Sequence, residues 1–228
     1  MNTPSSGNKF SKAEQTRAKI IDTFLDLMTV KKWDKITVKE ICGAAAITRG
    51  TFYQYFSDIY DLMEQIQDAL IDDVTRRYNR ISSQPVAAFP LEQFPDKFDY
   101  TAPESLRTWF NFCNENHKAI AALLDPEKGD EYFCKKIRAK LCDYINDMMD
   151  HDGMASDSLR NYFLKVFLEL HFLVARTWLT TDSDEFLSSD DLIQLLNSMR
   201  VGANYITWKS QTSDDFAKKM QIPDDHGK

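Results

Sequence analysis

The sequence predicts an all-α fold, with a small N-terminal domain of three helices that contains a helix-turn-helix and a larger helical domain after it. Apolar residues recur at the spacing of an α-helix along most of the chain, and no segment shows the strict alternation of a half-buried strand. The chain has 228 residues, which is long for one compact core and short for three. We therefore expect two domains built from helices.

Charge is divided unevenly along the chain. The formal net charge is −7, but residues 1–57 contain nine Lys or Arg against five Asp or Glu, which places +4 in this part and −11 in the remainder. A cationic head on an acidic body would direct an anionic partner, such as a phosphate backbone, to the head. Uneven charge also occurs as a merely solubilising surface, so charge alone does not decide the function.

The first predicted helix follows a polar, flexible tail, residues 1–12. Its apolar residues lie at positions i, i+3, i+4 and i+7, and they are Ile21, Phe24, Leu25 and Met28. After a break around Trp33, Thr37 and Glu40 have the S/T-x-x-E spacing of a capping box. A second helix is therefore expected to begin at Thr37.

Residues 37–56 are predicted to form two short helices about a tight turn. The first has apolar residues at helical spacing from Val38 to Ala45, and it is so short that only packing on its neighbours would stabilise it. Thr48 is placed to cap the second, in which Phe52 and Phe56 lie one turn apart on an inner face. This arrangement is a helix-turn-helix.

The rest of the chain also follows helical patterns. A long amphipathic helix is expected from Asp58 to about Tyr78, and the Pro- and Phe-rich segment 82–103 is expected to be a loop with at most a short helix. Helical spacing then resumes in 104–117, 118–124, 131–149, 159–179 and in a final helix whose stripe runs from Leu192 to Ile206.

The helix 159–179 is apolar around most of its circumference, so we expect one of its faces to pack inward and another to find a partner, while the final helix has a single apolar stripe. Two antiparallel helices that meet their copy as a four-helix bundle are typical of a two-fold interface. The alternative is that these residues form only the core of the monomer. The residues expected in the dimer interface are Phe163, Phe167, Leu170, Val174, Leu192, Leu195, Leu196, Met199, Ala203 and Ile206.

Thr37-Val38-Lys39-Glu40-Ile41 and the run Ala44–Phe56 resemble the DNA-binding signature of TetR-family (TetR/AcrR-like) transcriptional regulators. The resemblance covers about residues 13–73, and the remainder is similar to the family's variable domain only in length and helical pattern. It implies a DNA-binding domain at 13–73 and an effector-binding and dimerisation domain at 74–228. It also implies a cytoplasmic homodimer, a repressor that a small-molecule effector releases from a palindromic operator.

The resemblance assigns roles along the motif. The second helix of a helix-turn-helix presents its N-terminal residues to base edges in the major groove, so Arg49 and Thr51 are expected to read bases. Gly50 is expected to let the backbone come close to DNA, as in similar family members. The other polar side chains are placed to contact phosphates, and Gln54 could contact either a base edge or a phosphate. The expected DNA-binding residues are Thr37, Lys39, Thr48, Arg49, Gly50, Thr51, Tyr53, Gln54 and Tyr55.

Three positions depart from the family pattern. The usual glycine of the turn is Ala46, which costs about 1 kcal/mol if the backbone must be left-handed there. A second customary glycine is Lys32, and the lysine usually found three residues after the final Phe of the motif is Ile59. One phosphate contact typical of the family is therefore expected to be missing.

An all-helical domain can enclose an apolar cavity with a few polar anchors. The residues expected to line such a cavity are Phe94, Phe98, Trp109, Phe112, Tyr132 and Phe133, with His117 and His171 as polar anchors. Aromatic residues at helical spacing lie in the core more often than in a pocket, and each histidine is more often a satisfied residue of the core or the surface. The excess of acid in this domain favours a cationic or neutral effector over an anion.

Other function classes find little support in the sequence. The four Cys and four His show no metal-ligand spacing, and no Gly-rich phosphate loop or nucleophile motif is present, so we expect no metal, no cofactor and no enzyme activity. No apolar run is long enough to span a membrane. The alternatives kept open are a helical protein-interaction adaptor and a regulator without a small-molecule ligand.

Overall fold

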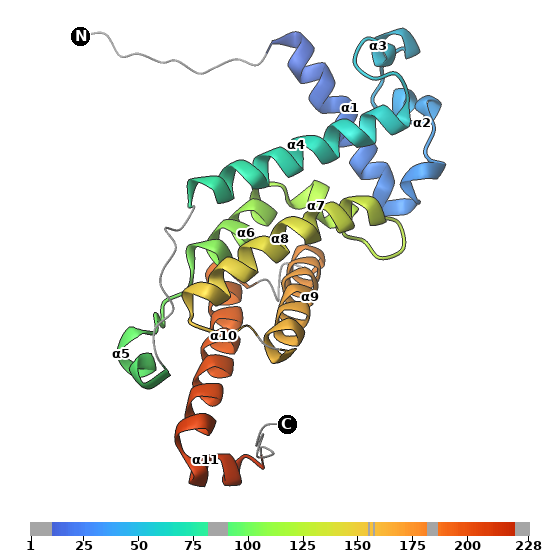
Figure 1. Ribbon diagram of the computed structural model, residues 1–228. Coiled ribbons are helices and arrows are strands. Elements are labelled where there is room, and N and C mark those ends of the chain that lie inside the picture. The colour runs from blue at the N-terminus through green and yellow to red at the C-terminus, as the bar shows by residue number, and fades with distance from the viewer. Residues whose placement is uncertain (1–10, 82–90, 155, 157, 182–186, 222–228) are drawn as a thin grey trace, which may run out of the picture. The chain divides into compact units, whose positions relative to one another are not determined.

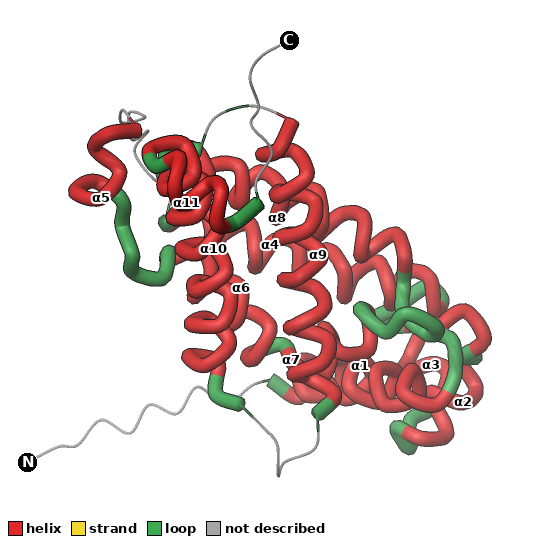
Figure 2. The backbone as a smooth tube through the Cα atoms, turned by 90° about the horizontal axis from the view of Figure 1, so that it is seen from below, coloured by secondary structure: helices red, strands yellow, loops and turns green. Residues whose placement is uncertain are grey.

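The computed structural model describes residues 11–81, 91–154, 156, 158–181 and 187–221 (Figure 1). Every element of secondary structure in these ranges is a helix, and Figure 2 shows only helices and loops, which confirms the predicted all-α fold. Most of the expected tail, residues 1–10, and much of the Pro-rich segment, residues 82–90, lie outside the described residues. No helix among the described residues is both long and apolar enough to cross a membrane.

The helices agree with the expected pattern except at their ends. Those of the N-terminal half are α1 (Lys12–Val30), the 3-10 turn η1 (Trp33–Lys35), α2 (Val38–Ala44), α3 (Arg49–Tyr53), α4 (Ile59–Arg80), η2 (Leu91–Gln93) and α5 (Phe94–Lys97). Those that follow are α6 (Glu104–Glu115), α7 (His117–Leu123), α8 (Glu131–His151), α9 (Ser158–Thr180), α10 (Ser189–Thr212) and α11 (Asp214–Lys219). The short α11 was not expected from the sequence.

The chain forms two compact units, which are described separately. The first unit comprises Met1–Asp72 and Lys118–Cys134, and the second comprises Asp73–His117 and Lys135–Lys228. The first unit thus contains a segment that the sequence analysis assigns to the larger domain. Lys128 Nζ of this segment donates to the Thr29 carbonyl at the end of α1, at 2.6 Å. The predicted domain limits at residues 13, 73 and 74 stay a prediction.

The core of the first unit joins α1, α2 and α3, with α1 against α2 and α2 against α3. Its stripe on α1 begins at the buried Ile20 rather than at the half-exposed Ile21, because Ile20, Phe24 and Met28 repeat every four residues on one face. Ile41 of α2 and Phe52 of α3 complete the core, and both are fully buried.

The second unit is built on α6, α9 and α10, which contact one another. A buried arginine, Arg200 of α10, ties three segments together. Its guanidinium donates to both carboxylate oxygens of Asp152 (2.6 and 2.7 Å) and to the carbonyls of Asp99 (2.7 Å) and Thr101 (3.0 Å). This fixes the end of α8 and the segment before α6 on α10, because bidentate charge-assisted hydrogen bonds are strong and directional.

Candidate DNA-binding surface and cavities

The start of α2 is fixed by a reciprocal cap. Thr37 Oγ1 accepts a hydrogen bond from the backbone N–H of Glu40 (3.3 Å), while Glu40 Oε2 accepts one from the backbone N–H of Thr37 (2.8 Å). Lys31 donates to Glu40 Oε1 at 2.7 Å, and Lys31 together with Thr37 lowers the pKa of Glu40 to about 2. The capping box predicted from the sequence is therefore formed, and its Glu40 carboxylate stays ionised.

The turn between α2 and α3 contains a strained residue. Ala46 has φ of 50°, in the left-handed region that disfavours residues with a Cβ. The backbone N–H of Ile47 donates to the Cys42 carbonyl at 3.0 Å and closes the turn. The turn thus requires a left-handed backbone at this position. A glycine would adopt it without strain, but this chain has alanine there.

The second helix of the motif, α3, has one buried and one exposed face. Thr48 Oγ1 accepts from the backbone N–H of Thr51 (3.1 Å) and caps the helix, as expected. Phe52 and Phe56 are buried with their ring centroids 5.7 Å apart, which anchors α3 from inside. On the opposite side Arg49 is exposed, and Tyr53 keeps 56% of its surface exposed.

The structure places the predicted DNA-binding residues mostly on the surface. Thr51 and Tyr55 are half-buried, and the Thr51 hydroxyl is engaged with that of Thr48 at 3.0 Å. Of the cations, Lys39 and Arg49 form no ion pair with any described residue, so their charges are available to an outside partner. The exposed members of the set are Thr37, Lys39, Thr48, Arg49, Gly50, Tyr53 and Gln54.

Gly50 is not required by the packing of the chain itself. A Cβ built on Gly50 would meet only Thr48 Oγ1, at 3.7 Å, which is an ordinary van der Waals contact. No positive φ is recorded at this glycine either. Packing within the unit thus leaves room for a side chain here, and the expected role of Gly50 in a close approach to DNA stays a prediction.

Residues 20–66 match the sequence model of a family described as bacterial regulatory proteins, tetR family. The matched range contains α2, the strained turn and α3. Over residues 20–66 the chain therefore carries the N-terminal domain of this family. Members of the TetR family are DNA-binding transcription factors and not enzymes. The match confirms the resemblance carried by residues 37–56.

Solved structures of regulators, two of them described as TetR regulators, share the fold over most of the chain. A fatty acid degradation regulator, FadR, from Bacillus halodurans has a TM-score of 0.54 at 17% identity, over 86% of this chain and 97% of its own. A putative TetR-family regulator from Syntrophomonas wolfei has the same TM-score at 16% identity, over 85% of this chain and 97% of its own. A TetR regulator from Streptococcus agalactiae has a TM-score of 0.50 at 18% identity, over 82% and 94%. No curated protein sequence matches the chain.

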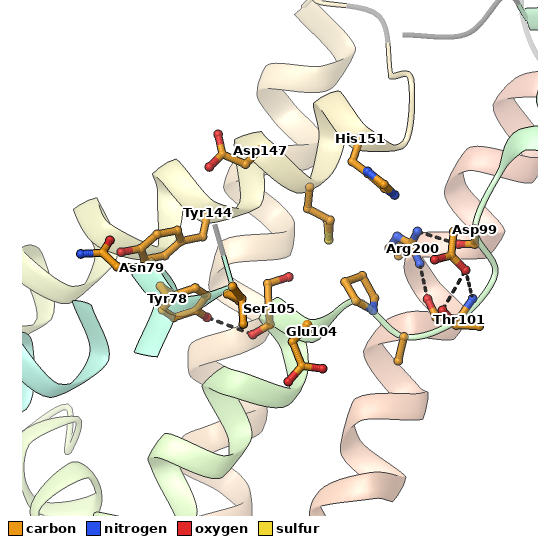
Figure 3. Close-up of a pocket in the computed structure, with 14 residues that line it drawn as sticks. Tyr78, Asn79, Asp99, Thr101, Glu104, Ser105, Tyr144, Asp147, His151 and Arg200 are labelled. Atoms are coloured by element: carbon orange, nitrogen blue, oxygen red, sulfur yellow. Dashed lines mark hydrogen bonds between the residues drawn. The ribbon is translucent and has the colours of Figure 1, made fainter. Parts of the chain in front are cut away.

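The second unit contains a cavity of about 520 Å³, which we call the tyrosine cavity (Figure 3). The rings of Tyr78 on α4 and Tyr144 on α8 stack in its wall, with centroids 3.7 Å apart and planes 5° from parallel. Tyr78 Oη donates to the Ser105 carbonyl (3.1 Å), and burial raises the pKa of Tyr78. The remaining wall consists of Asn79, Ile81, Asp99, Thr101, Ala102, Pro103, Glu104, Ser105, Asp147, Met148, His151 and Arg200.

The wall of the tyrosine cavity carries unbalanced negative charge. Arg200 is already paired with Asp152, whereas Glu104 and Asp147 form no ion pair with any residue in the described part of the chain. Partial burial, followed by Asp150 and Asp143, raises the pKa of Asp147. A cation placed in this cavity would be favoured and an anion disfavoured.

A second cavity, of about 450 Å³, lies beside the C-terminal half of α10, and we call it the Trp208 cavity. The rings of Phe94 and Trp208 stack at 5.5 Å in its wall. Its other lining residues are Asp152, Gly153, Met154, Leu159, Arg160, Phe163, Ala203, Asn204, Ile206, Thr207 and Gln211.

Of the residues predicted to line a pocket, Phe94 lines the Trp208 cavity and the others line neither of the two cavities. Phe98 packs under the Arg200 guanidinium, and His171 is buried with Nδ1 2.7 Å from the Phe167 carbonyl. The side chains of Trp109, Phe112 and Phe133 are fully buried, while those of His117 and Tyr132 are exposed. Among the histidines, His151 lines the tyrosine cavity, which sequence reasoning missed.

The residues predicted for the dimer interface divide into three groups. Phe167, Leu192 and Leu196 are buried within the second unit and belong to the core of the monomer. Phe163, Leu170, Val174 and Ala203 are half-buried, and Leu195, Met199 and Ile206 are exposed. On α9 the exposed apolar residues are instead Leu159, Tyr162, Val166 and Leu173.

Proposed function

We propose that this TetR-family chain is a cytoplasmic repressor that binds a palindromic operator as a homodimer and is released by a small-molecule effector. The DNA-binding part is carried by one observation. α3 is held from inside by Phe52 and Phe56, while Arg49, Gly50 and Tyr53 face outward on its other side. A short helix with a polar, partly cationic outer face and room for close backbone approach fits the major groove.

Exposed apolar residues on α9 and α10 support the homodimer. Tyr162, Val166 and Leu173 on α9 are 69%, 59% and 48% exposed, and Leu195, Met199 and Ile206 on α10 are 43%, 41% and 38% exposed. Both sets follow the spacing i, i+4, i+11, which keeps each on one face of its helix. Such faces bury more surface when they meet a copy of themselves, and a two-fold dimer presents α3 twice to a palindrome.

The tyrosine cavity supports the effector. Its wall includes Tyr78 and Asn79 of α4, and α4 begins at Ile59, a few residues after the motif. An effector that prefers one position of this helix over another would lower operator affinity by its differential binding to the two states. The acidic wall favours a cationic or neutral effector over an anion.

Selection of duplexes from a random pool with the purified protein tests the proposal. We expect a palindrome whose half-sites lie about 34–36 Å apart, or a multiple of that distance, and a complex of two chains per duplex in sedimentation velocity. Binding is then measured by fluorescence anisotropy for Arg49→Ala and Tyr53→Ala. Arg49→Ala should weaken binding about five- to 150-fold per half-site, because a base contact contributes about 1–3 kcal/mol of discrimination.

Lys135→Ala is the matched control, because Lys135 is exposed on α8 in the second unit and its loss changes net charge as Arg49→Ala does. It should leave binding almost unchanged. Two results would mean that α3 does not read DNA: equal weakening of binding by Arg49→Ala and Lys135→Ala, or no salt-sensitive preference for any duplex. Either result would favour the alternative of a helical protein-interaction adaptor. If compounds that bind the second unit never change operator affinity, the chain is a regulator without a ligand.

A further inference from the structure

The Trp208 cavity has the dimensions and the lining of a small-molecule site. Its volume of about 450 Å³ lies within the range of ligand pockets, roughly 300–1,000 Å³. Apolar side chains from four segments line it, among them Phe94 of α5, Met154 after α8, Leu159 of α9 and Ile206 of α10. The stacked Phe94 and Trp208 rings add a flat aromatic wall.

The cavity wall contains a buried donor without a partner. Trp208 Nε1 is buried and has no hydrogen-bond partner among the described residues. Trp178, in contrast, donates its indole N–H to the Leu187 carbonyl at 2.8 Å, as a buried indole normally does. An orphaned buried N–H is costly, so an acceptor that a small rotation of the indole brings within reach would be favoured.

One turn earlier on α10, Asn204 offers the complementary acceptor. Asn204 is 6% exposed, and its Nδ2 donates to the Arg200 carbonyl (3.0 Å) and to Asp152 Oδ2 (3.4 Å). Both of these partners only accept, so the amide must turn its NH₂ toward them and its oxygen away. Asn204 Oδ1 accepts no hydrogen bond from any other residue of the described ranges. Residues 204 and 208 share one face of the helix.

The charged groups of the wall are neutralised within the protein. Asp152 forms a buried ion pair with Arg200 at 2.6 Å. Arg160 pairs with Asp150 at 2.6 Å and also donates to the Met154 carbonyl at 3.0 Å. An ion entering the cavity would therefore lose its hydration without gaining a free countercharge.

We infer that the Trp208 cavity binds a neutral, mainly apolar molecule that carries one acceptor and one donor, of the kind an aromatic carboxamide presents. The acceptor pairs with Trp208 Nε1–H, the donor pairs with Asn204 Oδ1, and the apolar body lies on Phe94 and Trp208. The site is separate from the tyrosine cavity, and it does not depend on whether the chain responds to an effector. Ile206 lines the site and also belongs to the exposed α10 face proposed for the dimer, so the site borders that interface.

Four naphthalene probes test the site on the full-length protein. Naphthalene-2-carboxamide has both hydrogen-bonding groups, methyl 2-naphthoate has only acceptors, 2-ethylnaphthalene has neither, and 2-naphthoate is an anion. Isothermal titration gives the affinities, and ¹H–¹⁵N spectra follow the indole N–H signals of the four Trp. Trp208→Phe removes one of these signals and so assigns it. We expect the carboxamide to bind most tightly and to shift this signal.

Trp208→Phe also keeps an aromatic ring while it removes the N–H. It should weaken the carboxamide roughly tenfold, which corresponds to about 1.4 kcal/mol, and leave 2-ethylnaphthalene nearly unaffected. Tyr205→Phe is the matched control, because Tyr205 touches the Trp208 ring at 5.5 Å but does not line the cavity, and it should change neither.

Three outcomes would overturn the inference: no binding of the carboxamide, equal binding of the anion or the hydrocarbon, or a carboxamide affinity that Trp208→Phe leaves unchanged. The indole N–H signals distinguish binding in the Trp208 cavity from binding elsewhere on the protein. A shift confined to the other three Trp signals would mean that the carboxamide binds elsewhere, and the Trp208 site would then be wrong. Operator binding, measured on the same preparation, shows independently whether the proposed regulator function holds.

Discussion

Lowering the pH is expected to destabilise the second unit through one buried histidine. His171 of α9 is 3% exposed, its Nδ1 lies 2.7 Å from the Phe167 carbonyl, and its ring meets the Phe167 ring edge-on at 4.8 Å. A carbonyl only accepts, so Nδ1 carries the proton and donates. An imidazolium at this place would lose its hydration without a countercharge, and burial accordingly lowers the pKa of His171 from 6.5 to about 4.

The sign and the size of the effect follow from this shift. In the unfolded chain His171 takes up a proton near pH 6.5, whereas in the folded protein it stays neutral down to about pH 4. The unfolded state therefore binds the extra proton, and stability that is complete above pH 6.5 is lost as the pH falls from 6.5 toward 4. One proton costs about 1.36 kcal/mol per pH unit inside this window, so the loss between pH 7.5 and 4.5 is roughly 2.5 kcal/mol.

Urea unfolding at a series of pH values, followed by tryptophan fluorescence, measures this loss. Other groups titrate in the same range, so the informative quantity is the difference between the parent protein and His171→Gln, whose amide stays neutral. The parent should lose roughly 2.5 kcal/mol more than the variant between pH 7.5 and 4.5. The sequence pI of about 5.1 lies inside this pH window, and a protein with little net charge tends to associate. The measurement is therefore made at low protein concentration.

His117→Gln is the control, since His117 is exposed and removing it should not flatten the pH dependence. If the curves for the parent and for His171→Gln run parallel, the imidazole takes up its proton equally in both states. The assignment of a neutral, buried His171 would then be wrong. A steeper curve for the variant than for the parent would contradict it equally.

Two further changes have consequences for stability. Ala46→Gly should raise the free energy of unfolding by about 0.5–1 kcal/mol, because relief of the left-handed backbone at φ of 50° outweighs the added chain entropy; a lower midpoint in urea would show that the alanine is not strained. Arg200→Met should cost about 3–5 kcal/mol, because it leaves the buried Asp152 unpaired. Adding Asp152→Leu should recover much of that loss, and a double variant as unstable as the single one would contradict this account.

The N-terminal motif could be predicted from the sequence because its determinants are local. Thr37 and Glu40 are three residues apart, as are Thr48 and Thr51, and these pairs form the caps that their spacing indicates. Even the strain at Ala46 followed from the residue type at that place in the turn. The pattern placed the first residue of the apolar stripe on α1 at Ile21, whereas the buried residue is Ile20. The two side chains are chemically equal, so only packing distinguishes them.

The cavities could not be predicted in the same way, because they depend on contacts between distant residues. Apart from Asn197, three positions away, Arg200 finds its partners 48 to 101 positions away in the chain, and no local spacing points to them. Periodicity identified Trp109 and Phe112 as inward-facing but could not separate a side chain that fills the core from one that lines a space. The same limit applies to α9, where Tyr162 and Leu173 of the exposed apolar face lie outside the stripe that periodicity marked.

The shortness of α3 links the stability of the first unit to its affinity for DNA. An isolated helix of fewer than about 12 residues does not persist in water, and α3 has only five. The geometry proposed for DNA readout therefore exists only while Phe52 and Phe56 hold this helix on the core. Substitutions on the inner face should lower operator affinity and thermal stability together, because they reduce the population that can bind. Substitutions at Arg49 should lower operator affinity alone, since this side chain contributes nothing to the core.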